Sequence, residues 1–408
     1  MANTLLTIDM ITREALRLAH EKATFIGTIN RQFDDSFGQA GAKIGDTLRI
    51  RLPSEYTRRQ GSRVMDVQDS VQVSTVLTVA TQDGVDMRFN SRELALDLDE
   101  FSQLHLQPAL ASLMSNIDAD VLVGCTKATY PFAGIPGSTI SSLQTPGAAR
   151  TRLNQNLAPK GDRRLQVDSA IMANIVTNVA TYFNPSGAIS EQYREGLVAR
   201  TAMADYYENE RIWTFQNVSS LTNSSQKLND LSLTTLGINT LSVTSVLNPT
   251  IPVGMNFTIS SVYDVHPETK ANYGVRKQFT VVATAAASTW TISPPIYISG
   301  PRQNVHLGVL TATSVALSSL SISTATPVIS SYPLGLMYHK DAFTFATAEL
   351  PLMADASKCV RKTYDGLSVR VWQASDIRND ELLTRIDILY GYAAIRPQWA
   401  CRLYGANN

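Results

Sequence analysis

The chain has 408 residues, of which 35 are basic and 35 are acidic, so its formal net charge is zero. A hydrophobic fraction of 44% indicates folded domains with buried cores and excludes a chain that is disordered throughout. The balanced charge argues against a protein dedicated to holding nucleic acid. Because only 17% of the residues are charged, against a usual value of about 25%, we expect a surface that associates with other molecules.

The N-terminal segment predicts an amphipathic helix. Its apolar residues recur at steps of three and four positions, at Ile8, Ile11, Ala15 and Leu18. We interpret this helix either as an ordinary surface helix or as an arm that packs on another chain.

Two alternating segments, residues 43–53 and 71–79, predict the strands of a long hairpin. The tip between them is polar and carries the charged residues Arg58, Arg59, Arg63, Asp66 and Asp69. Its arginines could bind phosphate or pair with carboxylates of another chain, and a solvated charged loop is the alternative.

The strongest helical pattern lies at residues 106–129, which would form a helix of about 36 Å at 1.5 Å per residue. After it, further helices are predicted at residues 169–182 and 190–207. This part of the chain therefore has a mixed α/β pattern.

The composition changes at residues 212–333, which hold 8 charged residues and 36 serines or threonines. Strands are predicted at 255–259, 278–282 and 289–292, with proline and glycine between them. We expect a small inserted β domain, either a sandwich or a barrel, that folds on its own. Beyond it, strands are predicted at residues 342–348, 367–372 and 385–392.

The residues that carry chemistry are sparse. The three cysteines, Cys125, Cys359 and Cys401, lie far apart, which predicts no disulfide framework and a reducing compartment. The five histidines lack metal-site spacing, and the Gly-x-Ser-x-Gly motif of serine hydrolases is missing. We therefore expect no enzyme, no catalytic residue, no cofactor and no metal. The sequence also predicts no signal peptide and no membrane span.

The order of these parts resembles the major capsid (coat) protein of tailed bacteriophages, in the short-tailed-phage subtype with an inserted β domain. Residues 335–350, 366–371 and 385–391, followed by Arg396-Pro397, are similar to the late strands of that family. Residues 278–281 are similar to part of its inserted domain. The resemblance covers nearly the whole chain.

The resemblance implies an α+β fold, the tailed-phage capsid fold, with an inserted small β-barrel. The implied parts are an N-terminal arm (1–48), an extended loop (49–78), a peripheral domain with a spine helix (79–134), the first part of an axial domain (135–211), the inserted β domain (212–333), and return strands of the axial and peripheral domains (334–408).

The resemblance also implies the function. We expect a structural protein that self-assembles into hexamers and pentamers and forms an icosahedral shell around viral double-stranded DNA, without sequence-specific contact. Scaffolding and portal proteins are expected partners, no membrane is expected, and assembly in the host bacterial cytoplasm would lead to the virion capsid. The expected inter-subunit contact residues are Arg58, Arg59, Arg63, Asp66, Asp69, Asp97, Asp99 and Glu100.

Two other functions stay open. A bacterial nanocompartment shell protein is similar in fold and would enclose protein cargo in place of DNA. A glycan-binding protein or adhesin would use the Ser/Thr-rich β domain for binding.

Overall fold

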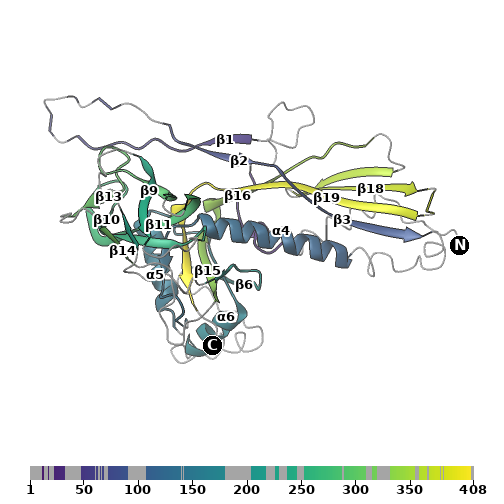
Figure 1. The fold of residues 1–408 in the computed structure, drawn as a ribbon, viewed down its shortest axis with the longest axis horizontal. Coiled ribbons are helices and arrows are strands. Elements are labelled where there is room, and N and C mark those ends of the chain that lie inside the picture. The colour runs from purple at the N-terminus through teal and green to yellow at the C-terminus, as the bar shows by residue number, and fades with distance from the viewer. Residues whose placement is uncertain are drawn as a thin grey trace. The chain divides into compact units, whose positions relative to one another are not determined.

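The fold was analysed in a computed structural model of the chain (Figure 1). The structure describes residues 12, 17, 23–32, 47–59, 61–62, 65, 67–68, 72–90, 107–138, 140, 142–179, 204–216, 226–228, 237–245, 252–286, 289–308, 315–318, 331–353, 358–364, 367–376, 378–379 and 381–405. The predicted N-terminal helix lies outside these residues except for Thr12 and Arg17.

The chain divides into two compact units. The first unit comprises Met1–Ile50, Thr75–Leu122 and Phe343–Ile395, and the second comprises Arg51–Ser74, Val123–Ala342 and Arg396–Asn408. The outer part of the predicted loop therefore groups with the second unit. The domain boundaries implied by the family resemblance stay a prediction.

A five-stranded sheet forms most of the first unit. Its strands are β3 (Thr81–Asn90), β16 (Phe343–Ala348), β17 (Lys358–Tyr364), β18 (Leu367–Asp376) and β19 (Glu381–Ala394), and their order is β16-β19-β18-β17, with β3 also on β19. The three strands predicted after residue 333 are thereby confirmed. The long β19 is the central strand, because it pairs with β16, β18 and β3. Its pairing with β3 is continuous, from Asn90 opposite Glu381 to Thr81 opposite Tyr390.

The long helix is confirmed as α4 (Gln107–Ala128), within one residue of the predicted ends. Its apolar stripe is buried at Leu110, Leu113, Ile117 and Val121, as the three- and four-residue spacing predicts. Among the described residues, no helix has the length and apolar character needed to cross a membrane.

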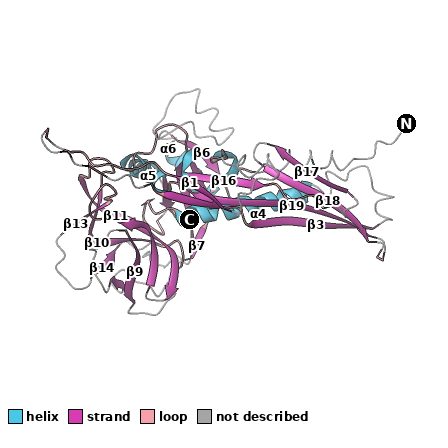
Figure 2. Cartoon of the chain, turned by 90° about the horizontal axis from the view of Figure 1, so that it is seen from above, coloured by secondary structure: helices cyan, strands magenta, loops and turns pink. Residues whose placement is uncertain are grey.

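A second sheet, with helices, lies in the second unit. Its strands follow the order β4-β20-β15-β5-β6, and β7 also pairs with β15. They are β4 (Phe132–Ala133), β5 (Arg163–Val167), β6 (Asp205–Glu208), β7 (Thr214–Gln216), β15 (Ser331–His339) and β20 (Ala400–Tyr404). The helices α5 (Gln144–Gln155) and α6 (Ser169–Val179) belong to the same unit (Figure 2).

One prediction fails here, and one helix was not predicted. The helix predicted at residues 190–207 is wrong at its end, because Asp205–Glu208 forms β6 and pairs in parallel with β5. Pairing with a neighbouring strand outweighs a weak helical pattern, and Tyr206 and Tyr207 favour strands. Residues 190–203 of that segment lie outside the described part of the chain. The helix α5 was also missed, because Pro146 and Gly147 in its first turn resemble a loop.

The insertion is a closed β structure. Its strands run in the order β11-β12-β9-β8-β14-β10-β13, and a further pairing of β10 with β11 closes the sheet on itself. They are β8 (Gln226–Leu228), β9 (Ile238–Ser245), β10 (Asn256–Val265), β11 (Asn272–Ala286), β12 (Thr289–Ile296), β13 (Val305–Leu307) and β14 (Val315–Ser318). The barrel, one of the two predicted architectures, is therefore the one formed.

The core of this barrel extends into the neighbouring sheet. Phe257, Phe279 and Trp290 of the insertion belong to one buried cluster with Tyr332 and Tyr404. The rings of Tyr332 and Tyr404 meet edge to face with their centroids 5.9 Å apart. The strands of the insertion pair mainly among themselves, but its core is not self-contained, because Tyr404 is contributed from outside residues 212–333.

Candidate subunit-contact surface

The predicted hairpin is formed by β1 (Thr47–Arg51) and β2 (Ser74–Thr78), which make a two-stranded sheet. Directly beyond the paired strands, toward the tip of the loop, the Leu52 amide donates to the Val73 carbonyl at 2.8 Å. Further out, the Thr57 amide donates to Gln68 Oε1 at 2.8 Å, and Gln68 Nε2 donates back to the Thr57 carbonyl at 2.7 Å. This side chain replaces two backbone bonds of a ladder and holds the two limbs of the loop together.

The loop exposes apolar side chains that one chain does not cover. Tyr56 is 59% exposed, Met65 is 82% exposed and Val67 is 78% exposed. Apolar groups gathered on an exposed segment indicate a contact with another molecule. Sequence reasoning singled out the charges of the tip and missed these three residues, although they stand in a segment that is otherwise mostly polar.

The structure places only part of the predicted contact set. Arg58 and Arg59 are exposed on the outgoing limb of the loop. The remaining six residues lie outside the described part of the chain: Arg63, Asp66, Asp69, Asp97, Asp99 and Glu100. The role of these eight residues in contacts between subunits therefore stays a prediction.

A buried carboxylate ties the N-terminal segment to the long helix. Asp118 on α4 is 0% exposed, and its Oδ1 accepts hydrogen bonds from the amides of Phe25 and Ile26 at 2.9 and 3.0 Å. Its Oδ2 accepts a third bond from Thr24 Oγ1 at 3.0 Å. These amides open the short 3₁₀ helix Ile26–Thr28, so the carboxylate acts as a cap supplied from another element.

A tyrosine joins the other face of the same helix to the sheet. The hydroxyl of Tyr390 on β19 lies 3.0 Å from a carboxylate oxygen of Asp83 and 3.0 Å from one of Asp120. Burial is the largest of the effects that raise the pKa of Tyr390. The charge of Asp120 and the hydrogen bond with Asp83 raise this pKa further. The hydroxyl therefore keeps its proton and acts as a donor between α4 and β3.

Arg402 fastens the insertion from within the second unit. Its guanidinium is completely buried and donates to the carbonyls of Gly254 and Lys127 and to Thr280 Oγ1, the last two at 2.8 and 3.1 Å. Burial lowers the pKa of Arg402 to about 10, which leaves it charged at neutral pH. One side chain of β20 thus links the end of α4 with β11 and the turn before β10.

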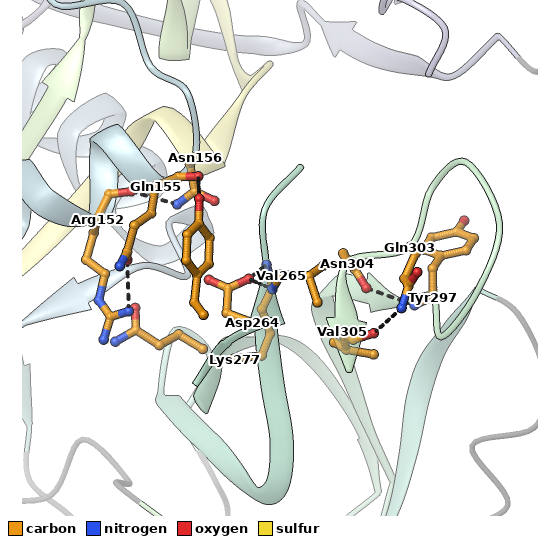
Figure 3. Close-up of polar contacts among 12 residues, drawn as sticks. Arg152, Gln155, Asn156, Asp264, Val265, Lys277, Tyr297, Gln303, Asn304 and Val305 are labelled. Carbon is orange, nitrogen blue, oxygen red and sulfur yellow. Dashed lines mark hydrogen bonds and ion pairs between the residues drawn. The ribbon is translucent and has the colours of Figure 1, made fainter. Parts of the chain in front are cut away.

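A second buried contact lies on the same strand as Thr280, because β11 also carries Lys277. Lys277 Nζ and Asp264 Oδ1 form an ion pair of 2.8 Å, with the two side chains 5% and 11% exposed (Figure 3). The Lys277 ammonium also lies 5.5 Å from the ring centre of Tyr130, so both partners of this buried pair have compensating contacts.

The turn between β12 and β13 is fixed by side-chain amides. Asn304 accepts from the Tyr297 amide at 2.9 Å and donates to the Pro295 carbonyl at 2.7 Å. Gln303 Nε2 donates to the Val305 carbonyl at 3.1 Å (Figure 3). These bonds hold the backbone around Gln303 in place, and the carbonyl of Gln303 accepts a hydrogen bond from Lys270 Nζ at 3.2 Å.

The described residues offer little for catalysis. They contain no group of three or more metal-binding side chains. Cys125 and Cys401 are buried, and burial raises the pKa of the Cys401 thiol to about 12. A thiol protonated at neutral pH is a poor nucleophile.

Residues 219–405 match the model of the family described as P22 coat protein - gene protein 5. This stretch covers a little under half of the chain and includes most of the insertion and all of the strands that follow it. The resemblance to a tailed-phage coat protein is thereby confirmed. A comparison with curated protein sequences finds no match.

Several solved structures are similar in outline. A structure from Mycobacterium phage Che8 has 8% identity and a TM-score of 0.49, covering 93% of this chain and 90% of its own. The capsid of Ralstonia phage GP4 has 7% identity and a TM-score of 0.46, with coverages of 93% and 87%. The capsid of Cyanophage P-SCSP1u has 13% identity and a TM-score of 0.45, with coverages of 89% and 84%. At these identities and TM-scores the three structures carry no inference about this chain.

Proposed function

We propose that this chain is the major coat protein of a tailed bacteriophage and that copies of it assemble into the shell of the virion. The observation that carries this proposal is the match of residues 219–405 to the P22 coat protein family. The chain is a structural protein and not an enzyme.

The loop supports this role physically. Its exposed apolar residues Tyr56, Met65 and Val67 lie on a hairpin without a core of its own. A shell subunit must bury surface against several neighbours, and a contact between different patches of identical chains closes into rings. The loop is the element of the described chain best suited to make such a contact.

The finer features of assembly follow from this role. Hexamers and pentamers would form an icosahedral shell with the help of scaffolding and portal proteins in the host bacterial cytoplasm. The zero net charge suits a wall that encloses double-stranded DNA without gripping it, because nonspecific DNA affinity comes from neutralised phosphates.

Assembly can be tested directly by expressing the chain with and without a scaffolding protein. Sedimentation and negative-stain microscopy are expected to show rings or closed shells. A strictly monomeric protein under both conditions contradicts the proposal. Shells formed in infected cells should contain double-stranded DNA, whereas shells filled with protein cargo would indicate a nanocompartment.

The contact residues can be tested with the substitution Arg58→Glu. Reversing this exposed charge should reduce the yield of shells while circular dichroism of the monomer stays unchanged. Lys160→Glu, an equal charge change at an exposed position in the turn before β5, is the matched control. Equal assembly by both variants would argue against a role of the tip.

A further inference from the structure

We propose that the inserted β domain braces the extended loop, and that Lys270 is the positioning residue that holds the loop through Glu55. This inference rests on the proposed function, because the direction of the loop matters only if the loop contacts another subunit. It assigns a role in assembly to the insertion.

The loop needs an external support. Its limbs are joined to each other by β1 and β2 and by the bonds of Gln68, but these contacts fix the shape of the hairpin and not its direction. Residues Arg51–Ser74 group with the insertion in one compact unit. In two perpendicular views, the loop runs past the end of the insertion that carries β13 (Figures 1 and 2).

Lys270 lies in the turn between β10 and β11, and the backbone of this turn is fixed. The Lys270 amide donates to the His266 carbonyl at 2.9 Å, and the His266 amide donates to the Ala271 carbonyl at 2.8 Å. The amides of Glu268 and Thr269 both donate to His266 Nδ1 at 3.1 Å. Lys270 itself has a φ of 59°, a left-handed conformation that is uncommon for lysine.

The ammonium group of Lys270 is also held in one position. Its side chain is only 14% exposed, and Nζ donates to the Gln303 carbonyl at 3.2 Å. From this position Nζ lies 3.7 Å from Glu55 Oε2 on the loop. Burial lowers the pKa of Lys270, and Glu55 opposes this by favouring the charged form.

This arrangement differs from an ordinary surface ion pair. Such pairs contribute little, partly because two long side chains must be immobilised. Here the turn and Gln303 already immobilise the lysine, so only Glu55, which is 57% exposed, loses freedom when the pair forms. The nearby cation Lys277 does not compete for Glu55, because it is paired with Asp264 at 2.8 Å.

The test measures the direction of the loop in the unassembled subunit. Spin labels at Arg58→Cys on the loop and His306→Cys on β13, in a Cys359→Ser background, report the distance between loop and insertion. Lys270→Gly removes the ammonium, and glycine accepts a φ of 59°, so the turn is expected to persist. We expect the distance distribution to broaden, with roughly a two- to five-fold loss of the main population.

Charge exchange separates positioning from a merely structural role. Glu55→Lys and Lys270→Glu alone should each broaden the distribution and slow shell formation. The double variant should restore both only in part, because a glutamate at position 270 cannot donate to the Gln303 carbonyl. Lys160→Glu is the control and should change neither. The unfolding midpoint of the monomer should stay constant in all variants.

The outcomes distinguish this proposal from the proposed function. If Lys270→Gly leaves both the distances and the assembly rate unchanged, the brace is wrong even though shells form. If the wild-type chain forms no shells but its distances broaden in Lys270→Gly, the brace stands and the assembly role fails. A double variant whose distance distribution is as broad as those of the two single variants also overturns the brace.

Discussion

Asp118 on the long helix accepts a hydrogen bond of 2.9 Å from the backbone amide of Phe25, ninety-three positions earlier in the chain. The same carboxylate oxygen accepts from Ile26, and the carboxylate is completely buried. The helix therefore supplies the polar group that the N-terminal segment needs in order to enter the core beside Phe343, whose ring lies 6.2 Å from that of Phe25.

Replacing Asp118 with asparagine should destabilise the first unit. Asparagine can keep one oxygen for the amides of Phe25 and Ile26, but it has no second oxygen to accept from Thr24 Oγ1 and no negative charge to strengthen these bonds. We expect a loss of about 2–3 kcal/mol in the free energy of unfolding, measured by chemical denaturation, because buried hydrogen bonds to charged groups are worth this much. Asn116→Ala, on the exposed side of the same helix, should cost less than about 0.5 kcal/mol. Equal losses in the two variants would contradict the capping role.

Arg402→Lys should loosen the attachment of the insertion. A lysine cannot reach the carbonyls of Lys127 and Gly254 and the hydroxyl of Thr280 with the same fork of donors. We expect the free energy of unfolding, measured by chemical denaturation, to fall by about 3 kcal/mol, since buried carbonyls are left without partners. The fluorescence of Trp213 can follow the change, because its ring centre lies 5.6 Å from the Arg402 guanidinium carbon. An unchanged midpoint of the denaturation curve would show that the carbonyls find other donors.

The sequence predicted the elements with strong periodicity well. The long helix was found within one residue because its stripe is buried at every turn. The strands at Asn256, Gln278 and Thr289 were found because β-branched and aromatic residues alternate there. Failures came where long-range contacts decide, as at Asp205–Glu208, which becomes a strand only because β5 lies beside it.

The contact site was only partly predictable for the same reason. Arg58 and Arg59 were identified because they are charged residues in a loop. Asp118 and Arg402, in contrast, resemble ordinary polar residues within apolar patterns. Their roles depend on carbonyls and amides from distant segments, such as Gly254 and Phe25, that periodicity does not reveal. A charged residue within a buried stripe, as Asp118 is between Ile117 and Val121, was the one available signal.

Gly391→Ala should disrupt the first unit. A Cβ at this position in β19 would meet the carbonyl of Thr78 and come within 2.8 Å of Val79 Cα. Backbone atoms cannot move aside as a flexible side chain can, so we expect a loss of about 3 kcal/mol or an insoluble protein. Gly147→Ala in α5 is the control, because a Cβ there meets nothing within 4 Å. That change should stabilise the chain by about 0.5–1 kcal/mol in thermal unfolding. Tolerance of Gly391→Ala would refute this close approach.

His339 should make the stability of the second unit depend on pH. It is 5% exposed, and its Nδ1 accepts the Asp341 amide at 3.2 Å, which requires an unprotonated nitrogen. Burial lowers the pKa of His339, and Arg163 and Arg164 lower it further, whereas Asp341 and Asp162 oppose them. The unfolded chain therefore binds a proton more readily than the folded chain does. The stabilisation is present above the ordinary histidine pKa of about 6.5 and is lost as the pH falls below it.

Measuring the free energy of unfolding between pH 7.5 and pH 5 tests this sign, with His339→Gln as the comparison. Glutamine can still accept the Asp341 amide through its side-chain oxygen but does not titrate. The wild-type chain should therefore lose more stability than the variant over this range. His306, which is exposed on β13, gives a matched control, because His306→Gln makes the same substitution at a histidine that is not buried. Parallel profiles for the wild type and His339→Gln would show that the acid sensitivity arises elsewhere, and a steeper fall in the variant would reverse the proposed sign.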